Sequence, residues 1–338
     1  VLEKAKKPVI FAGGGIAASH SEEELLTLAE KGGIPVTTSL MALGSFPGSH
    51  SLFLGMPGMH GTCPANLAMQ EADVLFAIGA RFDDRVTGKL NTFAPNAEII
   101  HIDIDPAEIG KNVDVGVPIV GDVKTVLQDF LKCFKGCQVS NWLEQIAKWK
   151  EERPLEYKTC EKTIKPQEVI QEISRQAGGK AIIGTEVGQH QMWTALYYTF
   201  NTSRSLISSG GLGTMGFGFP ASIGAQIGRP GELVFCIAGD GSIQMNMQEL
   251  ATVVEYNLPL KIVVINNGCL GMVRQWQELF FNKRYSQVKP QKSPDFVKLA
   301  SAFGIPAWKV EKPSEVKDAI SRAISTEGPV LIDFVVEP

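Results

Sequence analysis

The 338-residue sequence lacks the features that mark membrane, secreted and nucleic-acid-binding proteins. No apolar run approaches the roughly 20 residues that a membrane-spanning helix needs, and the opening residues, VLEKAKKPVI, contain no secretory hydrophobic region. The six cysteines form no CxxC pair and show no disulfide-framework spacing, so we expect reduced thiols in a cytoplasmic protein. The net charge of −4 gives no reason to expect a nucleic-acid partner. We therefore expect a globular protein that acts without membrane or nucleic acid.

The composition is that of an ordinary globular protein, with 44% hydrophobic and 20% charged residues. Short apolar runs that end in glycine or charged residues lie at 8–12, 34–38, 74–78, 99–104 and 118–120. Helical patterns separate these runs, and this alternation predicts a parallel sheet with helices on both faces. The length predicts two domains. We expect two doubly wound parallel α/β domains, over residues 1–150 and 166–338, joined by a linker over 151–165.

The stretch 233–276 carries the most specific pattern in the chain. It opens with an apolar run, 233–238, which predicts a buried strand and ends at Gly239-Asp240-Gly241-Ser242. Helical spacing follows over 244–257, and a second β-rich run over 260–265 ends at Asn266-Asn267. Polar residues thus follow two successive strands, at the sheet edge where parallel α/β proteins bind ligands.

These residue types suit a diphosphate held through Mg²⁺. Glycines beside Asp240 allow the backbone to approach a ligand closely. Asp240 offers a carboxylate and Asn267 an amide oxygen, which are ligands that Mg²⁺ accepts together with phosphate oxygens. A helix beginning after Ser242 would direct free N–H groups and a favourable field at the phosphates. Taken alone, GDGS is equally consistent with an ordinary strand-to-helix turn capped by Asp240.

The combined pattern resembles a known family. GDG, a helix, a strand and then NN resemble the thiamine diphosphate motif, and NNGCLGMVRQWQELFFNKRYS resembles the catalytic subunit of acetolactate synthases (acetohydroxyacid synthases). In the first domain, GMHGT, GARFDDRVTGKL and HIDIDPAEIGKN resemble the flavin-binding middle domain of the same enzymes. The resemblance therefore implies a middle FAD-binding domain followed by a thiamine diphosphate-binding domain. It also implies a fragment that lacks the N-terminal pyrimidine-binding domain and the C-terminal tail.

The resemblance implies an activity and its partners. Such an enzyme decarboxylates pyruvate and joins the hydroxyethyl unit to a second 2-oxo acid, either pyruvate or 2-oxobutyrate. The products are 2-acetolactate and 2-aceto-2-hydroxybutyrate, at the first common step of branched-chain amino acid biosynthesis. The implied cofactors are thiamine diphosphate, Mg²⁺ and a structural FAD. The implied assembly is a homodimer or tetramer with a possible small regulatory subunit. Because the activating glutamate belongs to the lacking domain, no catalytic residue is expected in this chain, and the fragment alone should be inactive.

Site residues follow from the resemblance in the second domain. For thiamine diphosphate they are Val187, Gly188, Gln189, His190, Gly213, Met215, Asp240, Gly241, Ser242, Asn267, Leu270, Gly271 and Met272. For Mg²⁺ they are Asp240, Asn267 and Cys269, the last through its backbone carbonyl. For the substrates they are Arg85, Met272 and Trp276. Met215 and Trp276 are also consistent with simple core packing, and Glu186 departs from the aspartate that is common in the family.

Flavin contacts are implied at the ends of the strands of the first domain. They are Gly13, Gly14, Gly15, Thr38, Leu40, Met41, Met59, His60, Gly61, Thr62, Gly79, Arg81, Asp83, Arg85, Asp103, Ile104, Asp122 and Val123. By pattern alone, the glycine triplet is only slightly better explained by a nucleotide than by a tight turn. His60 could be a packed histidine, and the charged Phe82-Asp83-Asp84-Arg85 cluster could be a surface ion-pair network.

Other functions remain open at this point. A flavin-dependent pyruvate oxidase and another thiamine-dependent carboligase share the general motifs, although Arg85 together with Trp276 favours acetolactate synthase. A non-catalytic cofactor-binding fragment is the alternative outside the enzymes.

Overall fold

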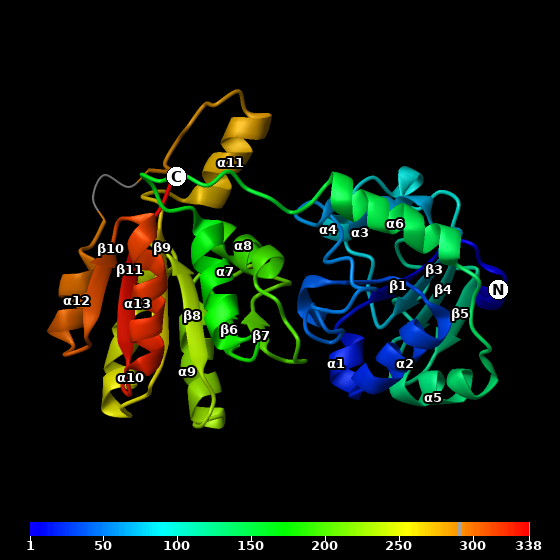
Figure 1. Cartoon of the computed structure of the whole chain (residues 1–338), viewed down its shortest axis with the longest axis horizontal. Helices are drawn as coiled ribbons and strands as arrows, with labels where there is room; N and C mark the ends of the chain where they lie inside the picture. The colour runs from blue at the N-terminus through cyan, green and yellow to red at the C-terminus, as the bar shows by residue number, and fades with distance from the viewer. Residues whose placement is uncertain (290–292, 338) are drawn as a thin grey trace. The chain divides into compact units, whose positions relative to one another are not determined.

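The computed structural model describes residues 1–289 and 293–337 and separates into two compact units (Figure 1). Unit 1 comprises Val1–Glu156 with Thr199–Arg204, and unit 2 comprises Tyr157–Tyr198 with Ser205–Pro338. Each unit is built on its own sheet, and every pair of neighbouring strands in both sheets runs parallel. The predicted fold class, two parallel-sheet α/β domains, is confirmed.

Unit 1 has a five-stranded sheet in the order β2-β1-β3-β4-β5. Its strands are β1 Pro8–Ala12, β2 Val36–Thr38, β3 Val74–Ile78, β4 Glu98–Asp103 and β5 Val117–Val120. Its helices are α1 Gly15–Ser19, α2 Glu22–Gly32, α3 Cys63–Glu71, α4 Asp84–Thr87, α5 Val123–Cys133 and α6 Ser140–Glu152. The five predicted strands are all present, with ends that move by no more than two residues.

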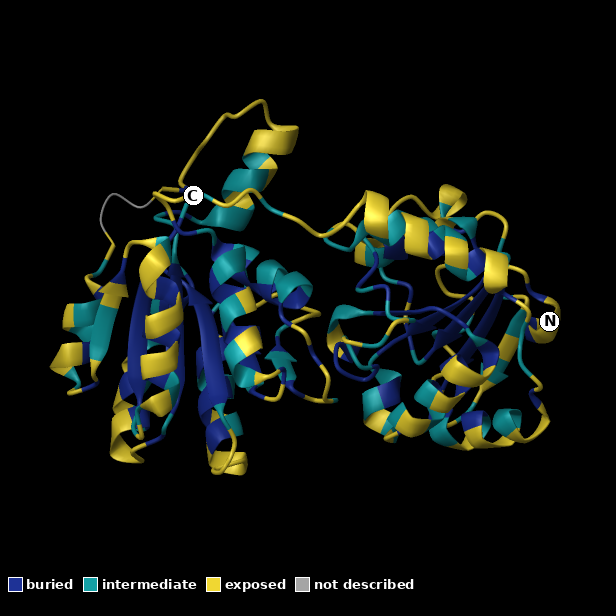
Figure 2. Ribbon diagram, viewed as in Figure 1, coloured by how far each residue is buried: buried dark blue, intermediate teal, exposed yellow. Residues whose placement is uncertain are grey.

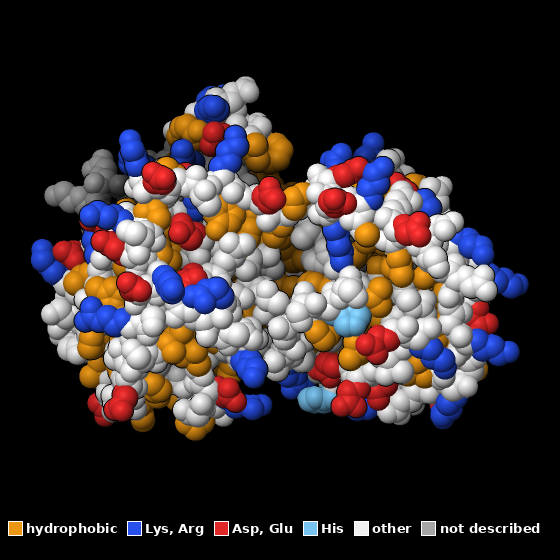
Figure 3. Space-filling model, in the orientation of Figure 1, with side chains coloured by type: hydrophobic (Ala, Val, Ile, Leu, Met, Phe, Trp, Pro, Cys, Tyr) orange, Lys and Arg blue, Asp and Glu red, His pale blue; other side chains and the backbone are white. Residues whose placement is uncertain are grey.

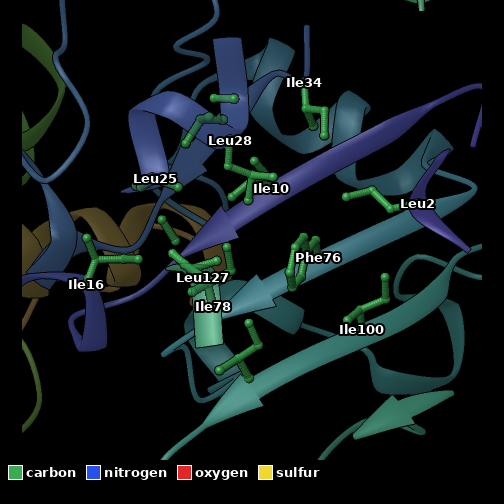
Figure 4. Packing of buried hydrophobic residues seen from close by; sticks show 14 of the residues in the cluster. Leu2, Ile10, Ile16, Leu25, Leu28, Ile34, Phe76, Ile78, Ile100 and Leu127 are labelled. Carbon is green, nitrogen blue, oxygen red and sulfur yellow. The ribbon is translucent and has the colours of Figure 1, made fainter. Parts of the chain in front are cut away.

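Helices cover both faces of the central strands of this sheet, which explains why β1 and β3 are continuously apolar and buried along their whole length. Ile10 on β1 packs with residues of α1, α2 and α5, whereas its neighbour Phe11 packs with residues of α3 and α6. Side chains alternate between the two faces of a strand, so one short apolar run supplies two cores. Figure 4 shows the first of these cores, in which Ile10, Phe76 and Ile100 from three adjacent strands meet Leu28 and Leu127 from the covering helices.

Unit 2 has a six-stranded sheet in the order β10-β11-β9-β8-β6-β7. Its strands are β6 Ile182–Thr185, β7 Leu206–Ser208, β8 Val234–Gly239, β9 Lys261–Asn266, β10 Ala307–Val310 and β11 Val330–Val335. Its helices are α7 Pro166–Ala177, α8 Gln189–Tyr197, α9 Gly218–Gly228, α10 Leu250–Glu255, α11 Gly271–Phe280, α12 Phe296–Ala302 and α13 Pro313–Ser325. Strand β8 is buried along its whole length, between helices whose outer faces are exposed (Figure 2).

One predicted helix is wrong in its first half. Residues 244–257 were expected to form one helix beginning after Ser242, but two short 3-10 turns, Ile243–Met245 and Met247–Glu249, come first. A regular helix, α10, begins only at Leu250. A helix dipole therefore does not begin at Ser242, and the electrostatic argument from a helix N-terminus does not apply there.

Two expectations from composition can be compared with the structure. All six cysteines are free thiols. In the part of the chain that the structure describes, no helix has both the length and the apolar character needed to cross a membrane.

Candidate functional site

The two motifs of unit 2 meet at the carboxyl edge of its sheet. Strands β8 and β9 are paired in parallel with Gly239 opposite Ile265, so Asp240 and Asn267 lie just beyond neighbouring strand ends. This adjacency was predicted from the sequence. Parallel strands end at the same edge, so residues that follow them are brought together although they are far apart in the chain.

The carboxyl group of Asp240 is buried and incompletely satisfied. The residue is 1% exposed, and its Oδ2 atom has no hydrogen-bond partner. Burial raises the pKa of Asp240 to about 6, against the effect of backbone N–H groups of Asp240, Asn267 and Gly241, which lower it. An ordinary cap uses one carboxylate oxygen and leaves the other to water, so the cap alternative does not explain why Oδ2 is buried without a partner. A divalent cation would satisfy it.

Asn267 and Cys269 form the facing side of this site. The Asn267 Oδ1 atom accepts a hydrogen bond from the Cys269 backbone N–H at 3.1 Å, which folds the chain back after β9. The Cys269 residue is buried, and burial raises the pKa of its thiol. A buried neutral thiol is a poor nucleophile. Cys269 could therefore serve a metal through its backbone carbonyl but offers no reactive sulfur.

The structure fits a metal that is completed by a ligand. Among the described residues, no group of three or more His, Cys, Asp or Glu side chains could hold a metal ion by itself. Asp240 would be the only carboxylate ligand, joined by the Asn267 amide oxygen and a backbone carbonyl. Mg²⁺ commonly binds through one or two carboxylates together with substrate phosphates, which matches this incomplete set.

His190 and Gln189, at the start of α8, line the same strand ends. The His190 ring is buried with its Nε2 atom unpartnered, and burial lowers its pKa to about 4, so the ring is neutral. A β-carbon added at Gly239 would lie 2.8 Å from His190 Nδ1, and one at Gly188 would lie 2.8 Å from Cε1. The glycine in front of Asp240 therefore makes room for this imidazole, a role that the sequence did not reveal.

Gln189 connects α8 to the turn after β9. Its Oε1 atom accepts a hydrogen bond from Asn267 Nδ2 at 3.4 Å, and its Nε2 donates to Gln275 Oε1 at 3.2 Å. A β-carbon at Gly271 would lie 2.0 Å from Gln189 Oε1. Glycine at 271 is thus needed for the close packing of these two segments around Asn267.

The remaining residues predicted for thiamine diphosphate surround Gly241. The Ser242 hydroxyl accepts from the Gly239 N–H at 3.0 Å, which closes the turn. A β-carbon at Gly241 would lie 2.6 Å from Leu270 Cδ2 and 3.9 Å from Met215 Cε. Val187 lies near Gly213, whose added β-carbon would be 3.8 Å from Val187 Cγ1. The structure therefore groups the predicted residues of four loops, after β6, β7, β8 and β9, at one edge.

Helix α11 carries Met272 and Trp276 one turn apart. Trp276 is 36% exposed, and its ring contacts the Phe280 ring at a centroid distance of 5.2 Å. No residue of this helix is buried, which argues against the core-packing alternative for Trp276. Hydrophobic side chains show at the surface over α11 (Figure 3). An exposed tryptophan with apolar neighbours is available for a ligand.

In unit 1 the glycine triplet is explained largely by the protein itself. A β-carbon at Gly13 would lie 2.0 Å from Gly79 O, and one at Gly15 would lie 2.6 Å from Gly79 Cα. The loops after β1 and β3 therefore touch through bare backbone. Gly14 differs, because its added β-carbon would make only an ordinary contact, 3.6 Å from Met41 Cβ.

This difference gives a matched pair of substitutions. Gly13→Ala should destabilise unit 1 by on the order of 3 kcal/mol, because backbone on both sides prevents relief of the clash. Gly14→Ala, in right-handed helical conformation, should leave stability within about 0.5 kcal/mol of the parent. Thermal unfolding of unit 1 compares the two. Equal destabilisation would contradict the packing explanation.

The other predicted flavin residues follow the carboxyl ends of the strands of unit 1. Some of their side chains are free to contact a ligand, and others already bond within the protein. Large apolar side chains are exposed at Met41, Met59 and Ile104. Thr38 is buried with its Oγ1 unpartnered. These features fit an apolar ligand with polar groups at that edge. Leu40, next to Met41 in a 3-10 turn, is half-buried.

Several predicted flavin side chains are already engaged. Asp122 caps α5 by accepting from the Thr125 N–H, and this bond is the main reason that its pKa is lowered. Val123 belongs to the core, so only its backbone could meet a ligand. Asp103 accepts from the Asp105 N–H at 2.9 Å. Glycine 61 packs against the Met56 carbonyl, and Thr62 caps α3.

The charged cluster after β3 remains open to a ligand. Asp83 caps α4 by accepting from the Arg85 N–H, while the Arg85 side chain is 62% exposed and lies 3.8 Å from Asp84. Arg81 is exposed. Burial and the nearby Arg85 charge lower the pKa of His60. An exposed ion pair of this length contributes little to stability. A structural ion pair is therefore a weak explanation for Arg85, and its guanidinium is available to a ligand.

Two residues that the sequence did not single out for a role complete the site. Glu186 is fully buried, and its carboxylate accepts hydrogen bonds from the Gly216 and Phe219 N–H groups. Asn246 donates from Nδ2 to the Gly216 carbonyl at 2.6 Å. Both act on the loop that carries Met215. Contacts between segments about 30 residues apart leave no local pattern from which they could have been predicted.

Comparisons with known proteins agree with this arrangement. Residues 1–130 match the family model described as thiamine pyrophosphate enzyme, central domain, and residues 186–334 match the one described as thiamine pyrophosphate enzyme, C-terminal TPP binding domain. The chain is 50% identical to the acetolactate synthase large subunit of Buchnera aphidicola from Acyrthosiphon pisum, covering 96% of the chain and 57% of that protein. It is 48% identical to the probable acetolactate synthase large subunit of Methanococcus aeolicus, covering 100% and 59%.

A third relative shows the same proportions. The large subunit of acetolactate synthase isozyme 3 from Escherichia coli K12 is 46% identical, covering 96% of this chain and 58% of that subunit. The chain thus spans somewhat under three-fifths of the length of the relatives that it matches.

Proposed function

We propose, since this chain belongs to the thiamine pyrophosphate enzymes and is similar over nearly its whole length to acetolactate synthase large subunits, that the protein catalyses acetolactate synthesis. In this reaction pyruvate loses carbon dioxide, and its remaining two-carbon unit is joined to the keto carbon of pyruvate or 2-oxobutyrate. The observation that carries the proposal is the buried, unpartnered Oδ2 of Asp240 beside Asn267, at the edge formed by β8 and β9.

Thiamine diphosphate supplies a thiazolium ring that takes up the electron pair released when carbon dioxide leaves a 2-oxo acid. The residues of unit 2 bind and orient it. Asp240, Asn267 and the Cys269 carbonyl would hold Mg²⁺ against the diphosphate. Neutral His190 and Gln189 would contact the diphosphate without adding charge. Met215, Leu270 and Met272 would provide apolar contacts, and the remaining residues assigned to this cofactor are Val187, Gly188, Gly213, Gly241, Ser242 and Gly271.

The glutamate that activates the cofactor is placed outside residues 1–338 in this proposal. Two glutamates lie near the motifs of unit 2, and both are committed elsewhere. Glu186 accepts from the Gly216 and Phe219 N–H groups, and Glu249 accepts from the Thr252 hydroxyl at 2.7 Å. Both oxygens of Glu186 and one oxygen of Glu249 are thus engaged within unit 2.

For unit 1 we propose an FAD site at the carboxyl edge of its sheet, with no net redox task. The exposed apolar side chains of Met41, Met59 and Ile104 support it. Arg85 would bind the carboxylate of a 2-oxo acid, because its planar guanidinium can donate two parallel hydrogen bonds to one carboxylate. We also propose a homo-oligomer with a small regulatory subunit, since the relatives are named as large subunits.

The test of this function uses the intact protein with pyruvate, thiamine diphosphate, Mg²⁺ and FAD. We expect acetolactate to form without oxygen consumption, and mixed products to form when 2-oxobutyrate is added. Omission of Mg²⁺ after chelation should abolish product formation. Carbon dioxide release with oxygen uptake and no acetolactate would identify an oxidase and reject the proposal.

A further inference from the structure

The carboxylate of Glu186 joins two segments at the cofactor edge of unit 2. The residue immediately follows β6 and is 0% exposed. Its Oε2 atom accepts from the Gly216 N–H at 2.6 Å, and its Oε1 atom accepts from the Phe219 N–H at 2.8 Å. Both bonds reach a turn about 30 residues further along the chain, which leads into α9.

A second side chain holds the peptide group on the other side of the Gly216 α-carbon. Asn246 lies between the two 3-10 turns that follow β8, and its Nδ2 atom donates to the Gly216 carbonyl at 2.6 Å. The N–H and the C=O of Gly216 are therefore both taken, by side chains from two different loops. Neither of the two peptide groups that flank Gly216 can rotate without breaking one of these bonds.

Backbone packing fixes this turn further. Gly216 has a φ of +93°, and a β-carbon there would lie 2.9 Å from both Asn246 Nδ2 and Met245 Cβ. A β-carbon at Gly218 would lie 2.3 Å from the backbone of Thr185 and Glu186. Only glycines allow this approach, so the turn sits directly on the end of β6.

The preceding residues are held less firmly. Residues 210–214 are exposed, and the bonds found within this turn are from the Thr214 N–H to Ser209 Oγ and from the Phe217 N–H to the Thr214 carbonyl. Met215 lies between this exposed stretch and the fixed Gly216, with its Cε atom 3.9 Å from an added β-carbon at Gly241. The placement of Met215 over the GDG turn therefore depends on how Gly216 is held.

The charge of Glu186 suits this task. The carboxylate lies at the N-terminal end of α9, where a negative charge is favoured, and N–H groups of Gly216, Gly218, Phe219 and Val187 oppose the rise that burial causes in its pKa. Hydrogen bonds from N–H groups to a carboxylate are stronger than those between neutral groups.

We propose that Glu186, together with Asn246, is a positioning residue that fixes the backbone on both sides of Gly216 and so holds Met215 in place over the GDG turn for the cofactor. The inference rests on the proposed thiamine diphosphate site, and it gives a task to Glu186, where the resemblance implied an aspartate. Glu186 itself does not touch the reacting atoms.

The test compares four variants of the intact protein: Glu186→Gln, Asn246→Ala, the double variant and, as control, Glu172→Gln. Gln at 186 keeps one acceptor oxygen but places an amide donor against one of the two N–H groups. Glu172 pairs with Arg175 on α7 and has no bond to the Met215 loop. Amide exchange over 213–219 is measured without cofactor, and thiamine diphosphate affinity is measured by calorimetry with Mg²⁺ present.

We expect Glu186→Gln and Asn246→Ala each to speed amide exchange over 213–219 by about 10- to 100-fold, the loss typical of a hydrogen bond to a buried group. Each should also weaken thiamine diphosphate binding. Both variants release the backbone of the same residue, Gly216. The loss of thiamine diphosphate affinity in the double variant should therefore be much smaller than the product of the two single losses. Glu172→Gln should match the parent in both measurements.

The outcomes separate this inference from the proposed function. A parent protein that binds no thiamine diphosphate rejects the proposed function. A parent that binds the cofactor, with variants that melt at lower temperature but show unchanged exchange over 213–219 and unchanged affinity, overturns the positioning role alone. Fully multiplicative effects in the double variant would also overturn it, since the two side chains would then act independently and not through the shared backbone of Gly216.

Discussion

Asp240→Asn is expected to stabilise the metal-free protein and at the same time to abolish Mg²⁺-dependent binding of thiamine diphosphate. The carboxylate is buried with an unpartnered oxygen, so its charge destabilises the folded state when no cation is present. Asparagine has almost the same shape and no charge. The presence of a destabilising aspartate at position 240 is best explained by a cation that it binds.

The size of the gain follows from the pKa of Asp240. A carboxyl group whose pKa rises from 3.8 to about 6 on folding binds protons more tightly in the native state, so stability falls as pH rises from about 4 to about 6. Above pH 6 the full cost is present, about 3 kcal/mol. Near pH 4 the Asp240 carboxyl group is protonated in nearly all folded molecules and in many unfolded ones. The cost of its burial to folding stability is then only about 0.5 kcal/mol.

Calorimetric unfolding of the metal-free parent and variant at pH 7 and pH 4 measures this effect. The gain from Asp240→Asn should be large at pH 7 and nearly absent at pH 4. Thiamine diphosphate affinity should fall by more than the roughly 10- to 100-fold seen when a residue that merely orients a metal ligand is changed. Glu249→Gln is the control, because it removes one charge from the same connection, where the carboxylate is half-buried and bonds Thr252. Undiminished cofactor binding by Asp240→Asn would reject the metal site.

The strands could be predicted because their signal is local. The apolar runs that form β1, β3, β8 and β9 are buried on both faces and end in glycine or in polar residues, so each can be recognised from the sequence alone. Once the sheet is parallel, the neighbouring positions of Asp240 and Asn267 follow from topology. The fold class and the centre of the site therefore required no knowledge of long-range contacts.

What could not be predicted depends on such contacts. The residues after Ser242 show helical spacing, yet they form 3-10 turns in which Asn246 reaches the Gly216 carbonyl. Gly13 was assigned to a flavin loop, but glycine is needed there because the backbone of Gly79, in another loop, packs directly against it. Glu186 stood out as a departure from the family without a reason, because its partners are backbone N–H groups rather than a charged side chain. Tertiary packing decides each of these cases, and residue type alone leaves them open.

Trp276 is expected to set the preference between the two acceptor substrates. On α11 it lies one turn beyond Met272, and its ring meets Phe280 while keeping 36% of its surface exposed. A flat, partly exposed aromatic ring can cover the ethyl group of 2-oxobutyrate, which is one methylene longer than the methyl group of pyruvate. A methylene in an apolar pocket is worth about 1–3 kcal/mol in discrimination.

Trp276→Leu should therefore lower the preference for 2-oxobutyrate over pyruvate by about 10-fold or more, within the roughly 10- to 200-fold range that one methylene can give. The measurement is a competition assay on the intact protein, in which 2-aceto-2-hydroxybutyrate and 2-acetolactate are quantified together. Phe280→Leu is the matched control, because it changes the neighbouring aromatic ring at the more exposed end of α11 while leaving the indole ring in place. If the two variants shift the product ratio equally, the discrimination comes from the apolar surface of the helix as a whole. An unaltered ratio in Trp276→Leu would remove Trp276 from the acceptor pocket, because leucine lacks the flat ring that is proposed to cover the ethyl group.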